Sequence, residues 1–392
     1  MEWKEVRLGD VCSELSDGLH KAPKFIVNGE YIFVNAKNLY NGYILDNDPT
    51  KKTSHEEYLK YKKPLGKHSI LYSIDGTIGN IAKYRGEKCV LGKGACYINC
   101  NPEIVESSYL YYQLQSPHFK SYIHLMSTGS TIKHISLKTM RDYVFELPSL
   151  EDQRRIASIL SSLDRKIELN NKINADLEEM AQAIFKNWFV DFEPFKDGKF
   201  VDSELGMIPE GWKVGGLFDI AEIFDKKRKP LSGNVREKMD KIYPYYGATS
   251  CMDYVDDYIF DGIYTLIGED GSVVKENGLP YMQYVWGKMW VNNHAHILQG
   301  KNGYSTEMIH ALLSITNIKF LVTGAVQAKL SQGNMQKILV AIPPKNVLDE
   351  IRPVIDNLYS KIRINTDENS RLSLLRDTLL PRLISGEIEV PE

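Results

Sequence analysis

The 392-residue chain has little cysteine and no CxxC pair. Its five thiols, Cys12, Cys89, Cys96, Cys100 and Cys251, are too few and too irregularly spaced for a disulfide scaffold or a four-thiolate zinc site. We therefore expect reduced cysteines. The chain also lacks an apolar leader at its start, and no apolar run approaches the ~20 residues that a membrane span needs. These absences predict a soluble cytoplasmic protein without a membrane partner.

A large excess of charge of either sign is also missing. The 48 Lys and Arg residues against 51 Asp and Glu give a net charge of −3, which argues against a strongly basic nucleic-acid binder. Counted by segment, the net charge is +3 for residues 1–150, −4 for 151–205, +1 for 206–345 and −3 for 346–392. The hydrophobic fraction of 43% excludes wholesale disorder, and the length predicts two or three domains.

Catalytic motifs are absent as well. The patterns GxxxxGK[ST], GxGxxG, [DNS]PP[YF], GxSxG and HExxH do not occur, so we predict no catalytic residues. One metal candidate exists, because His294 and His296 would share one face of a strand. A third ligand at a suitable spacing is not evident, so no metal is predicted and a zinc hydrolase is the weaker alternative. We interpret Asp75-Gly76 and Asp270-Gly271 as turns rather than as paired acids.

What the chain does contain is an internal repeat. Residues near the start recur 209 residues later, and residues from Thr128 onwards recur 195 residues later. The ends of the two copies match while their middles differ, which indicates one framework with two different inserts. The matched residues of the first copy are Trp3, Lys4, Leu8, Asp10, Thr128, Gly129, Ser136, Met140, Pro148, Leu163, Lys166, Ile167, Asn170, Asn174 and Leu177.

Each copy is predicted to be a domain followed by a long helix. Short β-like runs such as Tyr31–Val34, Ser69–Tyr72 and Cys96–Ile98 alternate with turn residues, and single helices are expected at about 107–125 and 305–321. We therefore predict an α+β fold of two globular α/β domains joined by two long helices. The predicted segments are a first domain at 1–148, a first helical region at 149–205, a second domain at 206–343 and a second helical region at 344–392.

The two helical regions carry matched heptad seams. Apolar residues and asparagines follow a spacing of four and three over 156–188 and again over 351–383, which is typical of coiled coils. Buried asparagines fix the register of a coiled coil, so we interpret both Asn pairs as register layers rather than as a wet face. An antiparallel pairing, which the repeat favours over the parallel one, would place Asn170 against Asn369 and Asn174 against Asn365. Only Leu163 against Arg376 would then be mismatched.

Basic and polar loops are the candidates for ligand contact. Lys226–Lys229 with Arg236 and Lys238 form a dense basic segment, and Lys21 and Lys24 lie in another. Such loops suit phosphate anchoring and base-edge contact, although solvated surface loops would have the same composition. The loops that begin at Thr128-Gly129 and Thr323-Gly324 offer hydroxyls, amides and close backbone approach, with a buried turn as the alternative.

Several phrases in the connectors resemble one protein family. Ala183–Phe192, Leu205–Trp212 and Leu375–Glu387, together with the second-copy phrases Lys227–Leu231, Tyr243–Ala248 and Asn292–His296 and the first-copy phrase Asp17–Lys24, are similar to the specificity (S) subunit of type I restriction–modification systems. The resemblance covers essentially the whole chain. It implies two target recognition domains that each read one half of a bipartite site in double-stranded DNA, with the paired helices as a spacer.

The resemblance also implies the partners and the cofactors. Two modification (methyltransferase) subunits and restriction (nuclease and motor) subunits would assemble with a non-catalytic chain that holds no cofactor, with S-adenosylmethionine, ATP and Mg bound by the partner subunits. Trp188, Phe189 and Phe192 are candidates for partner docking, with core packing as the alternative. A coiled-coil adaptor that joins two proteins without DNA is the rival function. Candidate DNA contacts are His20, Lys21, Lys24, Lys37, Asn38, Lys93, Thr128, Ser130, Lys133, Lys227, Arg228, Lys229, Arg236, Tyr246, Asn292, His294, Gln327 and Lys329.

Overall fold

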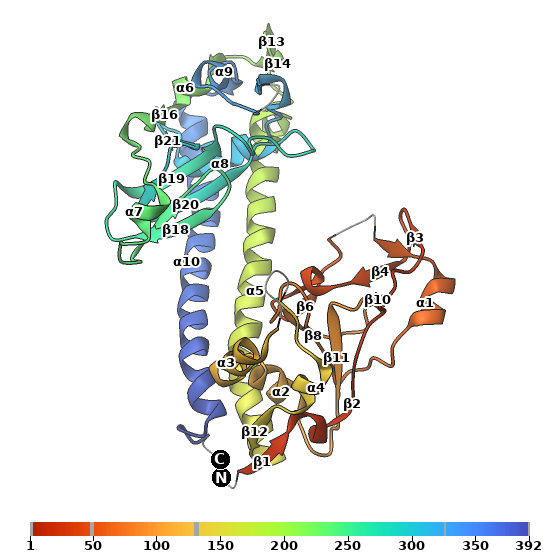
Figure 1. Cartoon of the computed structure of the whole chain (residues 1–392). Coiled ribbons are helices and arrows are strands. Elements are labelled where there is room, and N and C mark those ends of the chain that lie inside the picture. The colour runs from red at the N-terminus through yellow and green to blue at the C-terminus, as the bar shows by residue number, and fades with distance from the viewer. Residues whose placement is uncertain (1–2, 48–50, 129–132, 325–326, 391–392) are drawn as a thin grey trace. The chain divides into compact units, whose positions relative to one another are not determined.

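The computed structural model describes residues 3–47, 51–128, 133–324 and 327–390. The chain forms two compact units, of which unit 1 comprises Met1–Glu168 with Ser370–Glu392 and unit 2 comprises Leu169–Asn369. In the part of the chain that the structure describes, no helix is both long and apolar enough to cross a membrane. Figure 1 shows the two long helices as continuous ribbons, α5 in yellow to green and α10 in blue.

Unit 1 contains two small sheets of four strands and two strand pairs (Figure 1). The strand orders are β10-β4-β7-β3 and β2-β11-β8-β9, beside the pairs β1-β12 and β5-β6. The predicted runs at Tyr31–Val34, Ser69–Tyr72 and Cys96–Ile98 all lie in strands. Its elements before the first long helix are β1 (Lys4–Arg7), η1 (Leu8–Val11), β2 (Cys12–Asp17), β3 (Phe25–Ile26), β4 (Tyr31–Val34), η2 (Ala36–Asn38), β5 (Leu39–Tyr40), β6 (Tyr43–Ile44), β7 (Lys52–Thr53), α1 (His55–Tyr61), β8 (Ser69–Ser73), β9 (Ile81–Lys83), β10 (Cys89–Leu91), β11 (Ala95–Cys100), α2 (Ser107–Gln113), α3 (Pro117–Met126), α4 (Leu137–Arg141) and β12 (Val144–Leu147).

Unit 2 is built around one sheet of six strands in the order β16-β21-β19-β20-β17-β18, with the pairs β15-β22 and β13-β14 beside it. Its elements between the long helices are η3 (Glu193–Phe195), β13 (Phe200–Ser203), β14 (Gly206–Pro209), β15 (Lys213–Gly216), α6 (Leu217–Ile220), β16 (Ala221–Ile223), η4 (Asp225–Lys227), α7 (Gly233–Arg236), β17 (Tyr243–Tyr246), β18 (Cys251–Val255), β19 (Phe260–Gly268), β20 (Met282–Val291), β21 (Ala295–Gly300), α8 (Thr306–Ile315), η5 (Lys319–Leu321), α9 (Gln332–Met335) and β22 (Leu339–Ile342).

The repeat seen in the sequence reappears in the strand pairing of the two units. β1 pairs with β12 so that Lys4 faces Leu147, and β15 pairs with β22 so that Lys213 faces Ile342. The Leu8 amide donates to the Tyr143 carbonyl, and in unit 2 the Leu217 amide donates to the Ile338 carbonyl. The first members of the equivalent pairs are 209 residues apart in the sequence, and the second members are 195 residues apart. The predicted shared framework is therefore confirmed at the ends of each copy.

The shorter helices differ from the expectation. The single helix expected at about 107–125 is wrong, because α2 ends at Gln113 and α3 begins at Pro117. Ser116 caps α3 by accepting a hydrogen bond from the Phe119 amide, and Pro117 has no amide hydrogen with which to continue α2. The helix expected at about 305–321 also ends early, since α8 stops at Ile315 and η5 follows it.

The two long helices are α5 (Leu150–Phe189) and α10 (Lys345–Ile384), each 40 residues long. At 1.5 Å per residue, each would extend for about 60 Å. The predicted start of the first is confirmed by its cap, in which the Ser149 hydroxyl accepts a hydrogen bond from the Asp152 amide at 3.2 Å. Each helix contributes one half to each unit.

The helix halves of unit 2 pair antiparallel, as predicted. The Asn170 amide donates to the Asn369 side chain at 2.9 Å, and the Asn365 amide donates to the Asn174 side chain at 2.9 Å. Asn170 and Asn365 are buried at 1% exposure, so these contacts are internal layers and not a wet face. The two layers tie the register of α5 to that of α10 within unit 2.

The helix halves of unit 1 resolve the mismatch expected at Arg376. Its guanidinium forms an ion pair with Asp164 at 2.8 Å, next to Leu163 in the sequence. The apolar residues of the seam then join the core of the domain, where Ile156, Leu160 and Leu383 are buried. The helix halves of unit 2 pack in the same way, with Phe185, Ile351, Ile355 and Tyr359 in its core. Each domain is therefore held against its own pair of helix halves by burial of apolar surface.

Candidate nucleic-acid interface

Each unit places an Asp-Gly turn beside its Thr-Gly loop. In unit 1 the bridges join Asp75 to His134 and Thr128 to His134. In unit 2 they join Asp270 to Lys329 and Thr323 to Lys329, 195 residues further along in every case. We call each such group, the Asp-Gly turn with the loop that begins at Thr128 or Thr323, a loop tip. The sequence suggested the turns and the loops separately, and the structure brings them together.

The loop tip of unit 1 gathers positive charge around Asp75. The Lys93 ammonium and the His134 ring lie 4.0 and 3.9 Å from its carboxylate, and both side chains are partly exposed. The backbone next to His20 is bonded to the turn that carries Lys93, because the Leu19 amide donates to the Leu91 carbonyl and the Lys93 amide donates to the Leu19 carbonyl. His20 itself is exposed and bonds Asp17 at 3.0 Å. The predicted contacts His20 and Lys93 thus lie on one connected surface.

A hollow of about 400 Å³ opens beside this loop tip. Three basic side chains line it, from Lys120, His124 and Lys133, and none of the described residues that line it is acidic. Gly76 and Gly79 form part of its wall, both with positive φ, and a side chain at Gly76 would meet no atom within 4 Å. The hollow can therefore accept an anion such as a backbone phosphate.

The loop tip of unit 2 presents His294. The Asp270 carboxylate accepts a hydrogen bond from its Nδ1 at 2.5 Å, and the histidine side chain is 48% exposed. Its backbone amide donates to the Asn292 side chain at 2.8 Å. On either side of it, the carbonyls of Asn293 and Ala295 accept from the guanidinium of Arg228 at 3.2 and 2.8 Å. Four hydrogen bonds thus restrain His294. One is at its ring, one is at its backbone amide, and two are at the carbonyls of its neighbours.

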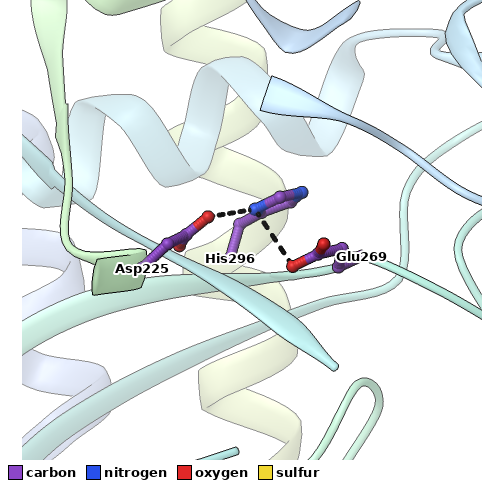
Figure 2. Close-up of side chains that lie close together, drawn as sticks. All are labelled: Asp225, Glu269 and His296. Carbon is purple, nitrogen blue, oxygen red and sulfur yellow. Dashed lines mark hydrogen bonds and ion pairs between the residues drawn. The ribbon is translucent and has the colours of Figure 1, made fainter. Parts of the chain in front are cut away.

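A largely buried ionic network lies next to this loop tip. Asp225 from η4, Glu269 at the end of β19 and His296 from β21 point toward one another (Figure 2). His296 is 1% exposed, and its Nδ1 lies 2.6 Å from Asp225 and 3.7 Å from Glu269. Arg228 reaches Glu269 at 2.6 Å. Burial would raise the pKa of the Asp225 carboxyl, but the hydrogen bond from His296 and the charges of His296 and Arg228 hold that pKa below its usual value.

The weaker alternative, a metal site that uses His294 and His296 together, is not supported. The first ring is exposed in the turn before β21, while the second is buried inside the sheet, so they do not converge on one ion. Asp225, Glu269 and His296 do lie close enough to surround a cation. However, the Nε2 of His296 lies 2.6 Å from the Leu330 carbonyl and its Nδ1 faces Asp225, so both nitrogens already have partners. Arg228 supplies positive charge to the same carboxylates. We interpret the group as a structural ion network.

The remaining predicted contacts of unit 1 divide by exposure. Lys21, Lys24, Lys37, Thr128 and Lys133 are exposed. By contrast, the side chain of Asn38 is 3% exposed and its amide donates to Leu45 and Asn47, so it supports the loop around η2. Ser130 lies outside the described residues.

The remaining contacts of unit 2 divide in the same way. Lys227, Lys229, Gln327 and Lys329 are exposed. Arg228, Arg236 and Asn292 are engaged inside the unit, with Arg236 bound to Asp253 at 2.7 Å and Asn292 buried beside Met252. Tyr246 is half-buried, and burial raises the pKa of its hydroxyl to about 12.

The aromatic residues at the end of α5 pack inside unit 2. Phe189 is 6% exposed and stacks on Phe185, while Phe192 and Trp188 meet Trp212 and Phe195 edge to face. This is the core-packing alternative of the two that the sequence left open. The docking role of these residues stays a prediction. Docking would use the part of each side chain that is exposed.

The sequence missed the residues that organise the second loop tip. Asp225, Glu269 and Gln332 were not singled out, although Gln332 donates to Asp225 at 2.6 Å. Asp225 and His296 are 71 residues apart, and nothing in their local sequence marks them as partners. The repeat offered one indirect signal. Asp270 is the counterpart of Asp75, so the sequence repeats an aspartate at a turn beside a basic loop in both copies.

Similar proteins share this architecture. The family model of the type I restriction modification DNA specificity domain matches residues 1–179 and 209–374. The specificity subunit of the type I restriction enzyme MjaIX of Methanocaldococcus jannaschii is 28% identical over 395 residues, which cover 94% of this chain and 86% of the relative. The HindI specificity subunit of Haemophilus influenzae is 24% identical and covers 99% and 100% of the two chains.

A solved structure agrees with these relatives. The crystal structure of the type I restriction–modification S subunit from M. genitalium has the same fold, with a TM-score of 0.58 at 18% identity over 98% of this chain and 96% of that chain. Two related domains and two long helices, the arrangement predicted from the sequence, are thus shared with it. The chain belongs to the family of type I restriction–modification DNA specificity subunits.

Proposed function

We propose that each globular domain reads one half of a bipartite target in double-stranded DNA. The observation that carries this proposal is the pair of equivalent loop tips. One framework presents an Asp-Gly turn and a Thr-Gly loop in each copy, while the side chains around them differ, with Lys93 and His134 in one and His294 and Lys329 in the other. A shared framework with different contact residues suits two readers of different sequences.

The proposed divisions of the chain are a first target recognition domain at 1–148 and a second at 206–343, separated by helical regions at 149–205 and 344–392. The paired helices set the gap between the two half-sites. The Asn layers support this role, because they tie the register of α5 to that of α10 within unit 2. A spacer of fixed register would hold two readers at a constant separation.

The proposed contacts fall into two groups. Exposed cations and polar groups near the loop tips, among them His20, Lys93, Lys133, Lys227, Lys229, Gln327 and Lys329, are proposed to touch DNA. Arg228, Arg236, Asn292 and Asn38 are proposed to act indirectly, because their polar groups are occupied within the protein. The basic hollow beside the first loop tip is proposed to hold a backbone phosphate.

The chemistry is proposed to reside in partner subunits. Two modification subunits would supply the methyltransferase, and restriction subunits would supply nuclease and motor, with S-adenosylmethionine, ATP and Mg bound there. The S subunit would act in the cytoplasm as a non-catalytic scaffold. Its acidic helices, with net charges of −4 and −3 for residues 151–205 and 346–392, suit contact with basic partner surfaces better than contact with DNA.

Base modification mapped across a host genome tests the proposal most directly. The modification subunits are expressed with and without this chain, and modified bases are located by sequencing. We expect a gapped two-part motif that depends on the chain. Modification that is independent of the chain, or a single uninterrupted motif, would contradict the proposal.

A further inference from the structure

We infer that His294 contacts a base edge in the half-site read by the second domain, and that Asp270 is the positioning residue that orients it. This inference rests on the proposed function and deepens it by naming a side chain that reads sequence. Arg228 and Asn292, which the sequence suggested as direct contacts, then act through the turn that carries His294.

The restraints on this side chain are its first support. The ring is held through Nδ1 by Asp270 at 2.5 Å, and the backbone amide of the same residue is held by Asn292 at 2.8 Å. The peptide carbonyls before and after it are both held by Arg228. Restraints on an exposed side chain add little to the stability of the fold. They do add to the affinity of a side chain that must meet a base edge, because less conformational freedom is lost on binding.

The buried network supplies the second support. Arg228 can hold two carbonyls only if its guanidinium is held in place. Glu269 at 2.6 Å and Asp225 at 3.4 Å hold it. Asp225 in turn binds His296 and Gln332, both at 2.6 Å. A chain of ionic and polar contacts thus runs from His296 in the sheet, through the carboxylates drawn in Figure 2 and Arg228, to the backbone on either side of His294. Flexible cations such as Lys227 and Lys229 suffice for phosphates and need no such support.

The free nitrogen of the ring supplies the third support. Because Nδ1 faces Asp270, the outward polar atom is Nε2, and among the residues that the structure describes it has no hydrogen-bond partner. A single polar atom in a fixed position suits one donor or acceptor of a base edge in the major groove. The side chain is nearly half exposed, so this atom is accessible.

The first domain carries a cation in the equivalent turn. β11 and β21 pair equivalently with β8 and β19, so that Ala95 faces Ser73 and Ala295 faces Gly268. The turn before β21 that carries His294 therefore corresponds to the turn before β11 that carries Lys93. Lys93 lies 4.0 Å from Asp75, the counterpart of Asp270. By this register Gly94 is the counterpart of His294 and Lys93 the counterpart of Asn293, so a basic side chain lies beside the turn aspartate in both copies but comes from adjacent positions of the turn.

The test uses the full chain in complex with its modification subunits. His294→Ala and Asp270→Ala are compared with the unaltered complex by motif mapping and by binding to DNA duplexes that differ at single base pairs of the second half-site. We expect His294→Ala to lose about 10- to 100-fold affinity for the cognate duplex and to relax the requirement at one base pair. Asp270→Ala should relax the same base pair, and the double variant should be no worse than His294→Ala, because both act through one ring.

Lys229→Ala is the matched control, since its side chain is exposed on the same unit and is proposed to meet a phosphate. It should weaken binding to all duplexes equally and lower the salt dependence by about one counterion. His294→Ala behaving in that way, or leaving every base preference unchanged, would overturn the inference. Unaltered requirements at the other base pairs of the second half-site show that the variant's second domain is folded. If the unaltered complex itself yields no gapped motif, the proposed function fails instead, and the two failures are thereby distinguished.

Discussion

At the residue scale, buried charge distinguishes the second domain from the first. The Leu330 amide donates to the Glu269 carbonyl, as the Ile135 amide donates to the Ile74 carbonyl in the first copy. The positions of the partly buried Glu269 and the buried His296 in one domain thus correspond to apolar ones in the other, where Ile74 and Cys96 are buried. The same framework therefore tolerates an ionic or an apolar interior at this place, and only the ionic version reaches out to hold a surface turn.

Removing one member of this network should destabilise unit 2. Asp225→Asn keeps the size of the side chain but removes one of the two carboxylates that face His296 and Arg228 and leaves only that of Glu269, and a broken buried pair typically costs about 3–5 kcal/mol. We expect faster native-state hydrogen exchange in β21, first at the Ile297 amide, which donates to Asp225 at 3.1 Å. Asp256→Asn, on the exposed surface, serves as the control. Equal exchange in the two variants would contradict the structural role.

The same carboxylate predicts a pH dependence. The pKa of Asp225 is lowered from its ordinary value of 3.8, so below that value the unfolded chain binds more protons than the folded one. Its contribution to stability is therefore fully present above about pH 5 and declines as pH falls through the lowered pKa of the folded state. The difference in free energy of unfolding between the unaltered chain and Asp225→Asn should shrink accordingly. Urea titrations between about pH 3 and pH 7 measure it, and a difference that grows in acid would contradict the assignment.

Exposure decided how well individual site residues could be predicted. Composition and motif phrases identified basic loops, and the exposed members such as Lys93 and Lys229 fit a contact role. They could not separate Arg228 from Lys229, although one is locked by two carboxylates and the other is free at the surface. That distinction depends on partners such as Glu269, 41 residues away from Arg228, which no local pattern reveals.

At the element scale, periodicity predicted the long helices well because their packing repeats every few residues. The seam of apolar residues and asparagines lies on one face, so the sequence itself states which side is buried. The antiparallel orientation followed from the repeat and is confirmed within unit 2 by the contact of Asn174 with Asn365. The sheets were harder, because their order depends on contacts between distant strands, as in the pairing of β16 with β21.

The asparagine layers should trade stability for a unique register. Replacing Asn174 and Asn365 together by leucine removes a buried polar pair, and we expect the helix halves of unit 2 to become more stable by about 1–2 kcal/mol. Other registers should then become populated. Cysteines introduced by Leu177→Cys and Ile362→Cys, which the predicted register places together, report this as a fall in disulfide yield.

The control for this experiment is an exposed change on the same helix, Leu169→Ala, which should leave the yield unchanged. A leucine pair that cross-links as completely as the asparagine pair would show that register is set elsewhere. A leucine pair that unfolds more easily would show that the asparagines contribute net stability. The first result would remove the register role from these layers, and the second would contradict the predicted gain in stability.

At the scale of the whole molecule, the repeat explains why the net charge was a poor guide. The value of −3 averages two mildly positive domains with two acidic helical regions. DNA would meet only the domains, and there the exposed cations gather at loop tips and at the hollow lined by Lys120, His124 and Lys133. Local arrangement, rather than the sum of charges, is what matters for binding.

The repeat also predicts that the two readers act independently. Residues 1–145 hold the first domain as far as the second residue of β12, and the core of unit 1 is distinct from the core of unit 2. Replacing these residues by the corresponding domain of another S subunit should therefore change one half of the modified motif and leave the other half and the gap intact. His294→Ala, combined with this replacement, should still relax a base pair in the unchanged half, because its supporting contacts all lie in unit 2. Motif mapping of the single and combined variants measures both effects. If the replacement alters both halves, the domains do not read independently, and if His294→Ala then acts on the replaced half, the assignment of the second domain to its half-site is wrong.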